Sequence, residues 1–105
     1  MGKTLVSEDG RFEWDETKEI QNKKKHGFLF REILEVFDDP AFLEGFDTEH
    51  SGNEERFYGI GCLNNVLYII AFYTIRNERK RIISARKADK NEQEAYNGYF
   101  KKINF

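Results

Sequence analysis

The stretch Arg81-Ile82-Ile83-Ser84-Ala85-Arg86 decides the fold predicted for this chain, together with the residues that follow it. A mixture of apolar, β-branched and small residues between two arginines is typical of a half-buried strand. Neighbouring side chains of an extended strand point to opposite faces, so we expect Ile82, Ser84 and Arg86 to share one face. Arg81 would then lie on the other face, and the two arginines would be separated by the sheet.

A helix is predicted directly after this strand. Asp89 and Glu92 have the three-residue spacing of an N-cap residue and its reciprocal partner. The apolar residues that follow recur at helical spacing and form one stripe: Ala95, Tyr96, Tyr99, Phe100 and Ile103. A strand ending at Arg86 would therefore be joined to a helix carrying Tyr96, which places a cation and a phenol on one small platform.

Composition sets the class of protein. The length of 105 residues predicts a single domain, and its composition predicts a phenylalanine-rich core. Residues 1–10 are predicted to form a disordered tail. Cys62 is the only cysteine, so it can form neither an internal disulfide nor a cysteine-based zinc site. The sequence shows no apolar run of membrane length and no signal peptide, and we expect a cytoplasmic protein without a membrane partner.

The charge is distributed unevenly along the chain. Residues 76–105 carry nine basic and four acidic side chains, a net charge of +5. The other 75 residues carry 8 basic and 15 acidic side chains, a net charge of −7. A basic end on an acidic body predicts an anionic partner at one surface, but a solvated turn and helix would produce the same pattern.

Two helices are predicted near the start of the chain, after a strand at residues 12–15. The first covers residues 16–25, with Asp15 as its N-cap and Gly27 as the residue that ends it. The cations at residues 23–26 would favour the dipole at its C-terminus, which is an alternative to a ligand-binding role. The second is a core helix, because its apolar residues follow the i, i+3, i+4, i+7 pattern: Phe30, Ile33, Leu34 and Phe37.

Four strands are predicted in the second half of the chain, at residues 41–47, 55–63, 66–75 and 81–86. The third is nearly all apolar and aromatic, as is typical of a central strand covered on both faces. Short turns between successive strands predict antiparallel pairing. The order β-α-α-β-β-β-β-α therefore indicates an α+β fold, with one antiparallel sheet packed by helices.

Cations and acid–base groups remain as candidates for chemistry. Cleavage of an RNA phosphodiester needs a base, an acid and stabilisation of the charge on phosphorus, and arginine suits the last task. The candidates are Arg81, Arg86, Tyr96, His26 and Glu55. Each has a structural alternative: the arginines as surface salt-bridge partners, and Tyr96 as an aromatic at the edge of the core. His50 lies in a polar loop, where we expect no specific role, and no metal site is predicted.

Several segments, in order and with compatible spacing, form a recognisable series. They are residues 12–15, 25–27, 30–32, 35–40, 54–57, 60–61 and 81–88, with Glu92 and Tyr96. Together they resemble the BrnT toxin family. The resemblance implies a RelE-like fold with a curled antiparallel sheet, and a metal-independent ribonuclease, without cofactor, that blocks translation by cleaving RNA. It also implies a BrnA-like antitoxin with a ribbon-helix-helix element, through which alone the complex would bind DNA.

The resemblance also favours particular site residues. It implies that Arg81 and Arg86 hold the scissile phosphate, that His26 or Glu55 takes the proton, and that Tyr96 belongs to the site. Further RNA-binding residues would be Arg56, Arg79, Lys80 and Lys87. The alternative is a non-catalytic interaction domain that binds a ribbon-helix-helix partner as a co-repressor.

Overall fold

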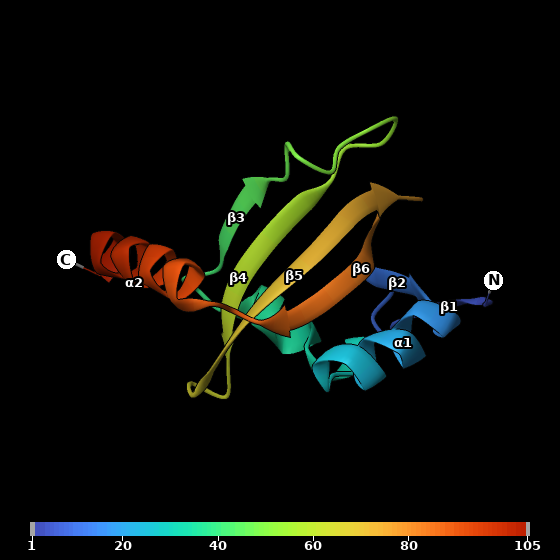
Figure 1. Ribbon diagram of the computed structural model, residues 1–105, viewed down its shortest axis with the longest axis horizontal. Helices are drawn as coiled ribbons and strands as arrows, with labels where there is room; N and C mark the ends of the chain where they lie inside the picture. Colours follow the sequence, from blue (N-terminus) through green and yellow to red (C-terminus); the bar gives the residue numbers. More distant parts are fainter. Residues whose placement is uncertain (1, 105) are drawn as a thin grey trace.

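The computed structural model describes residues 2–104 and contains one six-stranded sheet in the order β1-β2-β6-β5-β4-β3 (Figure 1). The elements are β1 (Thr4–Val6), β2 (Phe12–Asp15), α1 (Glu16–His26), the 3₁₀ helices η1 (Phe30–Glu32) and η2 (Leu34–Asp38), β3 (Leu43–Phe46), β4 (Phe57–Leu63), β5 (Leu67–Arg76), β6 (Arg79–Lys87) and α2 (Lys90–Asn104). The predicted α+β class is confirmed. No helix within residues 2–104 has the length and apolar character needed to cross a membrane.

The sheet is mixed, whereas an antiparallel sheet was predicted. β2 pairs in parallel with β6, so that Trp14 lies opposite Ile82, and every other pairing is antiparallel. Residues 4–6, expected to be disordered, form β1 instead and pair with β2. The turn between β1 and β2 uses Gly10 at a φ of 76°, a conformation that glycine adopts without steric cost.

The predicted second helix is replaced by two short 3₁₀ helices. Ile33, at φ −111° and ψ 3°, separates them, and the Glu32 carboxylate accepts a hydrogen bond from the N–H of Leu29 (2.7 Å). Phe30, Ile33 and Val36 are fully buried. This three-residue repeat of buried side chains matches the three residues per turn of a 3₁₀ helix.

The predicted helix termini are confirmed. The Asp15 carboxylate accepts from the N–H of Lys18 (3.0 Å), and Gly27 ends α1 with a φ of 87°. Before α2, the Glu92 N–H donates to Asp89 and the Asp89 N–H donates to Glu92, both at 2.8 Å. This reciprocal pair fixes the direction in which α2 leaves β6.

The two faces of the sheet are covered differently. The packed face carries the main core, in which Phe12, Trp14 and Tyr73 lie against residues of η1 and η2. The other face, which we call the open face, is covered at one end by α2, where Tyr96 packs with Ile60 and Ile70. Figure 1 shows α2 extending away from the sheet, so much of the open face is left uncovered.

A β-bulge in β6 corrects the predicted placement of the two arginines. Ser84 lies opposite Phe72 and Ile82 lies opposite Tyr73, so Ile83 is an extra residue in β6. Arg81 therefore pairs with Thr74 and Arg86 with Ile70, positions four residues apart on β5. An extra residue reverses the alternation of side chains, and both arginines consequently lie on the open face.

Candidate functional site

The central groove lies on the open face between the β3–β4 loop, β5 and the first turn of α2. It encloses about 510 Å³. Its walls include an imidazole, an aromatic ring, a guanidinium and a carboxylate, contributed by His50, Phe72, Arg86 and Glu92. Four different elements supply these side chains, so only the tertiary structure brings them together.

His50 is oriented by Asp47. The Nδ1 atom of His50 lies 3.2 and 3.1 Å from the two carboxylate oxygens of Asp47. A carboxylate only accepts hydrogen bonds, so Nδ1 is the donor, and the Nε2 atom of the neutral ring is left with a free lone pair. The Asp47 side chain is 10% exposed and that of His50 is 57% exposed. Nε2 of His50 is therefore an exposed potential proton acceptor, and the largely buried Asp47 carboxylate holds the ring in place.

The loop that carries His50 is closed at its base by hydrogen bonds. The N–H of Asp47 donates to the carbonyl of Arg56 (2.7 Å). The hydroxyl of Ser51 donates to the carbonyl of Asp47 (2.7 Å) and accepts from the N–H of Arg56 (3.0 Å). These bonds fix both ends of the loop, because a short side chain here satisfies backbone groups that no strand pairs.

Two guanidinium groups flank one aromatic ring. The guanidinium carbons of Arg56 and Arg86 lie 5.5 and 5.7 Å from the ring centroid of Phe72. Arg86 donates two hydrogen bonds to Glu92, at 2.8 and 2.9 Å, which raise the pKa of its guanidinium above the usual value. Arg56 lies 3.5 Å from Asp47. Both guanidinium groups are thus held beside His50 by carboxylates, and a guanidinium fixed in this way can still donate hydrogen bonds to an anionic substrate.

A second hollow, the side hollow, adjoins the central groove at His50. It encloses about 280 Å³, shares His50 with the groove, and is also lined by Glu55, Arg56, Thr74 and Ile83. The hydroxyl of Thr74 donates to the carbonyl of Glu55 (2.7 Å), which fixes the backbone there. Glu55 and Arg56, both predicted site residues, thus lie next to His50.

His26 lies in a third hollow, the edge hollow, where the C-terminal half of α1 meets β6. This hollow encloses about 230 Å³ and shares Ile83 with the side hollow. Burial lowers the pKa of His26 most, and the charges of Lys25 and Arg86 lower it further. His26 is therefore near the central groove but not part of it.

The structure does not bring Tyr96 to the groove. Tyr96 is 5% exposed, and its hydroxyl donates to Asp39 (2.6 Å). Burial and this hydrogen bond raise the pKa of Tyr96. The same carboxylate accepts from the N–H of Cys62 (2.8 Å), so the phenol joins α2 to β4. This placement matches the core-edge alternative for Tyr96.

On the open face, Arg81 forms contacts with side chains of β2 and β1. Its guanidinium lies 2.5 Å from Glu13, whose side chain is 2% exposed, and 3.3 Å from the hydroxyl of Thr4. Arg79 contributes a second, longer contact to Glu13 at 3.7 Å. These contacts join β6 to β2 and β1. The position of Arg81 therefore matches the alternative that it is a salt-bridge partner and not an RNA-binding residue.

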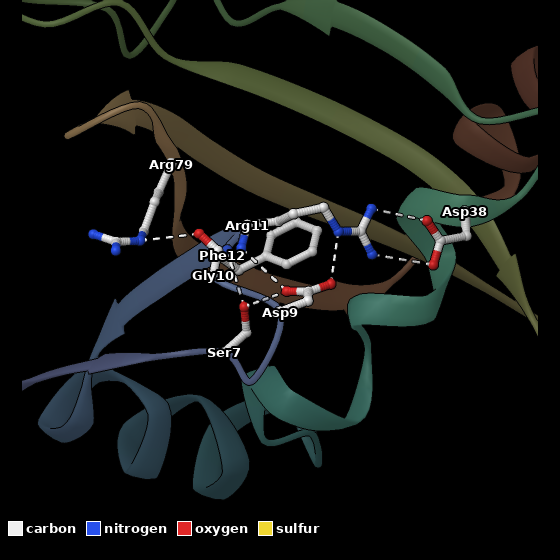
Figure 2. A network of polar contacts seen from close by, with 7 residues as sticks. All are labelled: Ser7, Asp9, Gly10, Arg11, Phe12, Asp38 and Arg79. Atoms are coloured by element: carbon white, nitrogen blue, oxygen red, sulfur yellow. Dashed lines mark hydrogen bonds and ion pairs between the residues drawn. The ribbon is translucent and has the colours of Figure 1, made fainter.

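The other predicted RNA-binding residues of β6 are dispersed. Figure 2 shows Arg79 donating to the carbonyl of Gly10 (3.0 Å), beside Arg11, which bridges Asp9 and Asp38. Lys80 lies on the packed face, with its Nζ atom 5.4 Å from the ring centroid of Phe37. Lys87 is exposed at the end of β6. None of these three lines the central groove.

Sequence reasoning missed the residues that form the centre of the site. His50 was expected to have no specific role, and Asp47, Phe72 and Glu92 were not proposed as site residues. The signal that was available is the three-residue spacing of Asp47 and His50 before the Glu54-Glu55-Arg56 strand start. That spacing alone does not show that the loop folds over Arg86.

Comparisons with known proteins agree with this fold. The family model described as "Ribonuclease toxin, BrnT, of type II toxin-antitoxin system" matches residues 14–92. Among solved structures, the Brucella abortus ribonuclease toxin, BrnT, is similar with 26% sequence identity and a TM-score of 0.55. That match covers 73% of this chain and 94% of the Brucella chain. A search of curated proteins found no match.

Proposed function

Because the chain belongs to the BrnT family of ribonuclease toxins of type II toxin–antitoxin systems, we propose that it cleaves RNA in the central groove. The observation that carries the proposal is the Asp47–His50 pair, which lines the central groove with Arg86 and has Arg56 in the adjoining side hollow. This arrangement supplies a proton acceptor and a binding site for phosphate within one groove. The fold and the family support a ribonuclease, and the groove supports these particular residues.

The proposed reaction uses the 2′-hydroxyl of RNA as the nucleophile. Nε2 of His50 takes the 2′-OH proton while Asp47 holds the ring in the required tautomer and stabilises its charged form. The 2′-oxygen forms a bond to phosphorus, and the bond from phosphorus to the 5′-oxygen breaks. The departing 5′-oxygen takes a proton from water, the resulting hydroxide takes the proton from Nε2 of His50, and a 2′,3′-cyclic phosphate is left. The proton acceptor proposed from the sequence, His26 or Glu55, is replaced by His50.

Arg86 and Arg56 would stabilise the charge that develops on the phosphate oxygens. A guanidinium offers a planar fork of donors that matches two phosphate oxygens. Arg86 is held in place by Glu92, so little reorganisation is needed when phosphate binds. Since the arginines perform this task, we propose that cleavage is independent of metal ions.

The family also indicates the setting of this activity. A type II toxin has a protein antitoxin, and we propose that the partner here is BrnA-like and contacts DNA on behalf of the complex. Cleavage of cellular RNA in the cytoplasm would reduce translation and arrest growth. Antitoxin binding would suppress this effect.

The test compares the two histidines in purified protein on an oligoribonucleotide. We expect His50→Gln to lower kcat by about 10²–10⁴, the usual contribution of a general base. His26→Gln is the matched control and should retain kcat. Activity should persist in EDTA, and induction of the parent, but not of His50→Gln, should arrest growth.

Three results would overturn this assignment. Unchanged kcat in folded His50→Gln, together with loss in His26→Gln, would place the base in the edge hollow. Loss of activity in EDTA with recovery on adding a divalent metal would refute metal independence. A folded parent protein that binds antitoxin but cleaves no RNA would favour the non-catalytic interaction domain.

A further inference from the structure

The edge hollow has an unusual set of walls for a surface depression. α1 contributes Lys18, Gln21, Lys25 and His26, and β6 contributes Ser84 beside the bulge at Ile83. Lys18 and Lys25 are seven residues apart, so both lie on the same side of α1. The hollow is therefore lined by basic and polar side chains from one face of a helix.

The basic side chains of this hollow have no acidic partner in the described part of the chain. Among residues 2–104, Lys18, Lys25 and His26 form no ion pair with an acidic side chain. Lys23 differs, because on the same helix it pairs with Glu32 at 3.4 Å. Burial lowers the pKa of His26 most, and the positive charges of Lys25 and Arg86 lower it further. A concave region of unbalanced positive charge attracts an anion.

The floor of the hollow is rigid. Asn22 is 6% exposed, and its side-chain amide donates to the carbonyls of Phe28 and Ala85, both at 2.9 Å. Its carbonyl oxygen accepts from the N–H of Ala85 (3.1 Å). Asn22 thus substitutes for a strand partner where β2 has ended, and it fixes α1 against the edge of β6. The backbone of α1, which carries the basic side chains of the hollow, is therefore held in place against β6.

The edge hollow lies near the proposed cleavage site, with the side hollow between them. It shares Ile83 with the side hollow, and the side hollow shares His50 with the central groove. Ser84 and Arg86 follow the bulge and are two residues apart, so they share one face of β6. Three neighbouring hollows therefore follow one another from α1 to the central groove.

We propose that the edge hollow is a second phosphate site for the RNA strand that is cut in the central groove. Lys18, Lys25 and His26 would bind a backbone phosphate near the scissile one, without reading the base. This inference rests on the proposed function, because the strand is positioned by both sites together. Contacts of this kind fix the register of a nucleic acid and add salt-dependent affinity.

The test uses two substrates of different length. A dinucleoside monophosphate carries only the scissile phosphate, whereas a single-stranded oligoribonucleotide can also reach the edge hollow. We expect Lys18→Gln/Lys25→Gln to raise KM for the oligonucleotide about tenfold while kcat, and all kinetics on the dinucleoside, stay unchanged. The dependence of log affinity on log salt should weaken by about 0.7 for each lost phosphate contact.

The control removes the same charge from another side of the same helix. Lys23→Gln/Lys24→Gln should leave KM for the oligonucleotide within about twofold of the parent. Equal losses in both double variants would mean a non-specific charge effect and would overturn the proposal, as would no loss in either. Binding of an uncleavable 2′-O-methyl strand is measured in parallel, so that the hollow is tested even if His50 is not the base.

Discussion

Replacing Arg81 by alanine should destabilise the protein rather than remove a catalytic group. The carboxylate of Glu13 is buried between β2 and β6, and Arg81 is its close partner at 2.5 Å. Removing one member of a buried ion pair costs about 3–5 kcal/mol, because the other charge stays buried without compensation. Arg79 still lies 3.7 Å from Glu13, so we expect the lower end, about 3 kcal/mol.

This loss is large compared with the stability of a small domain. The free energy of unfolding of such domains is about 5–15 kcal/mol, and a loss of 1 kcal/mol lowers Tm by roughly 4–8 °C at this size. Arg81→Ala should therefore lower Tm by roughly 12–24 °C. Adding Glu13→Gln to Arg81→Met removes both charges and should recover much of the loss, since neutral groups of similar size carry no buried charge.

Urea unfolding measures the free energy of each variant, and cleavage is then measured per folded molecule below the unfolding temperature. We expect Arg81→Ala to retain kcat and the double variant to regain stability. The reasoning is refuted if Arg81→Ala stays within about 0.5 kcal/mol of the parent while kcat falls as it does for a loss at Arg86. That result would return Arg81 to the catalytic site, as predicted from the sequence.

Two further predictions concern Arg86 and Tyr96. In a cleavage assay, Arg86→Ala should lower kcat/KM by about 10²–10³. Arg86→Lys should recover only part of this loss, because an ammonium lacks the planar fork of donors. Full recovery by lysine would contradict this and show that a point charge suffices. Tyr96→Phe should cost about 1–2 kcal/mol in urea unfolding without changing kcat, because it removes the hydrogen bond to Asp39. The raised pKa of Tyr96 means that its stabilisation is present below pH 10.0, tyrosine's ordinary pKa, and is lost as the pH rises further. Tyr96→Phe should therefore lose less stability between pH 8 and pH 11 than the parent, and equal losses would contradict this account.

The candidate site was only partly predictable. Arg86, Arg56 and Glu55 were expected in the site, and the structure places all three in or beside hollows that contain His50. His50 itself was not expected, because nothing in a polar loop indicates which surface the loop will cover. Tyr96 has the residue type of a catalyst, but its burial and its hydrogen bond to Asp39 depend on how α2 packs.

Local signals in the sequence determined the elements whose causes are local. Capping residues defined both ends of α1 and the start of α2, because a cap acts within a few residues. Alternating and continuous apolar runs identified β4, β5 and β6 in the same way. The order of motifs was also sufficient to indicate the family that the comparisons then showed.

Only the tertiary structure decided how these elements meet. The bulge at Ile83 moves Arg81 to the same face as Arg86, and a bulge depends on the pairing partner in β5. The parallel pairing of β2 with β6 buries Glu13 and places it in an ion pair with Arg81. His50 meets Arg86 because a loop between β3 and β4 closes over the neighbouring strands. Contacts between residues far apart in the chain depend on the packing of the whole sheet, so local patterns cannot specify them.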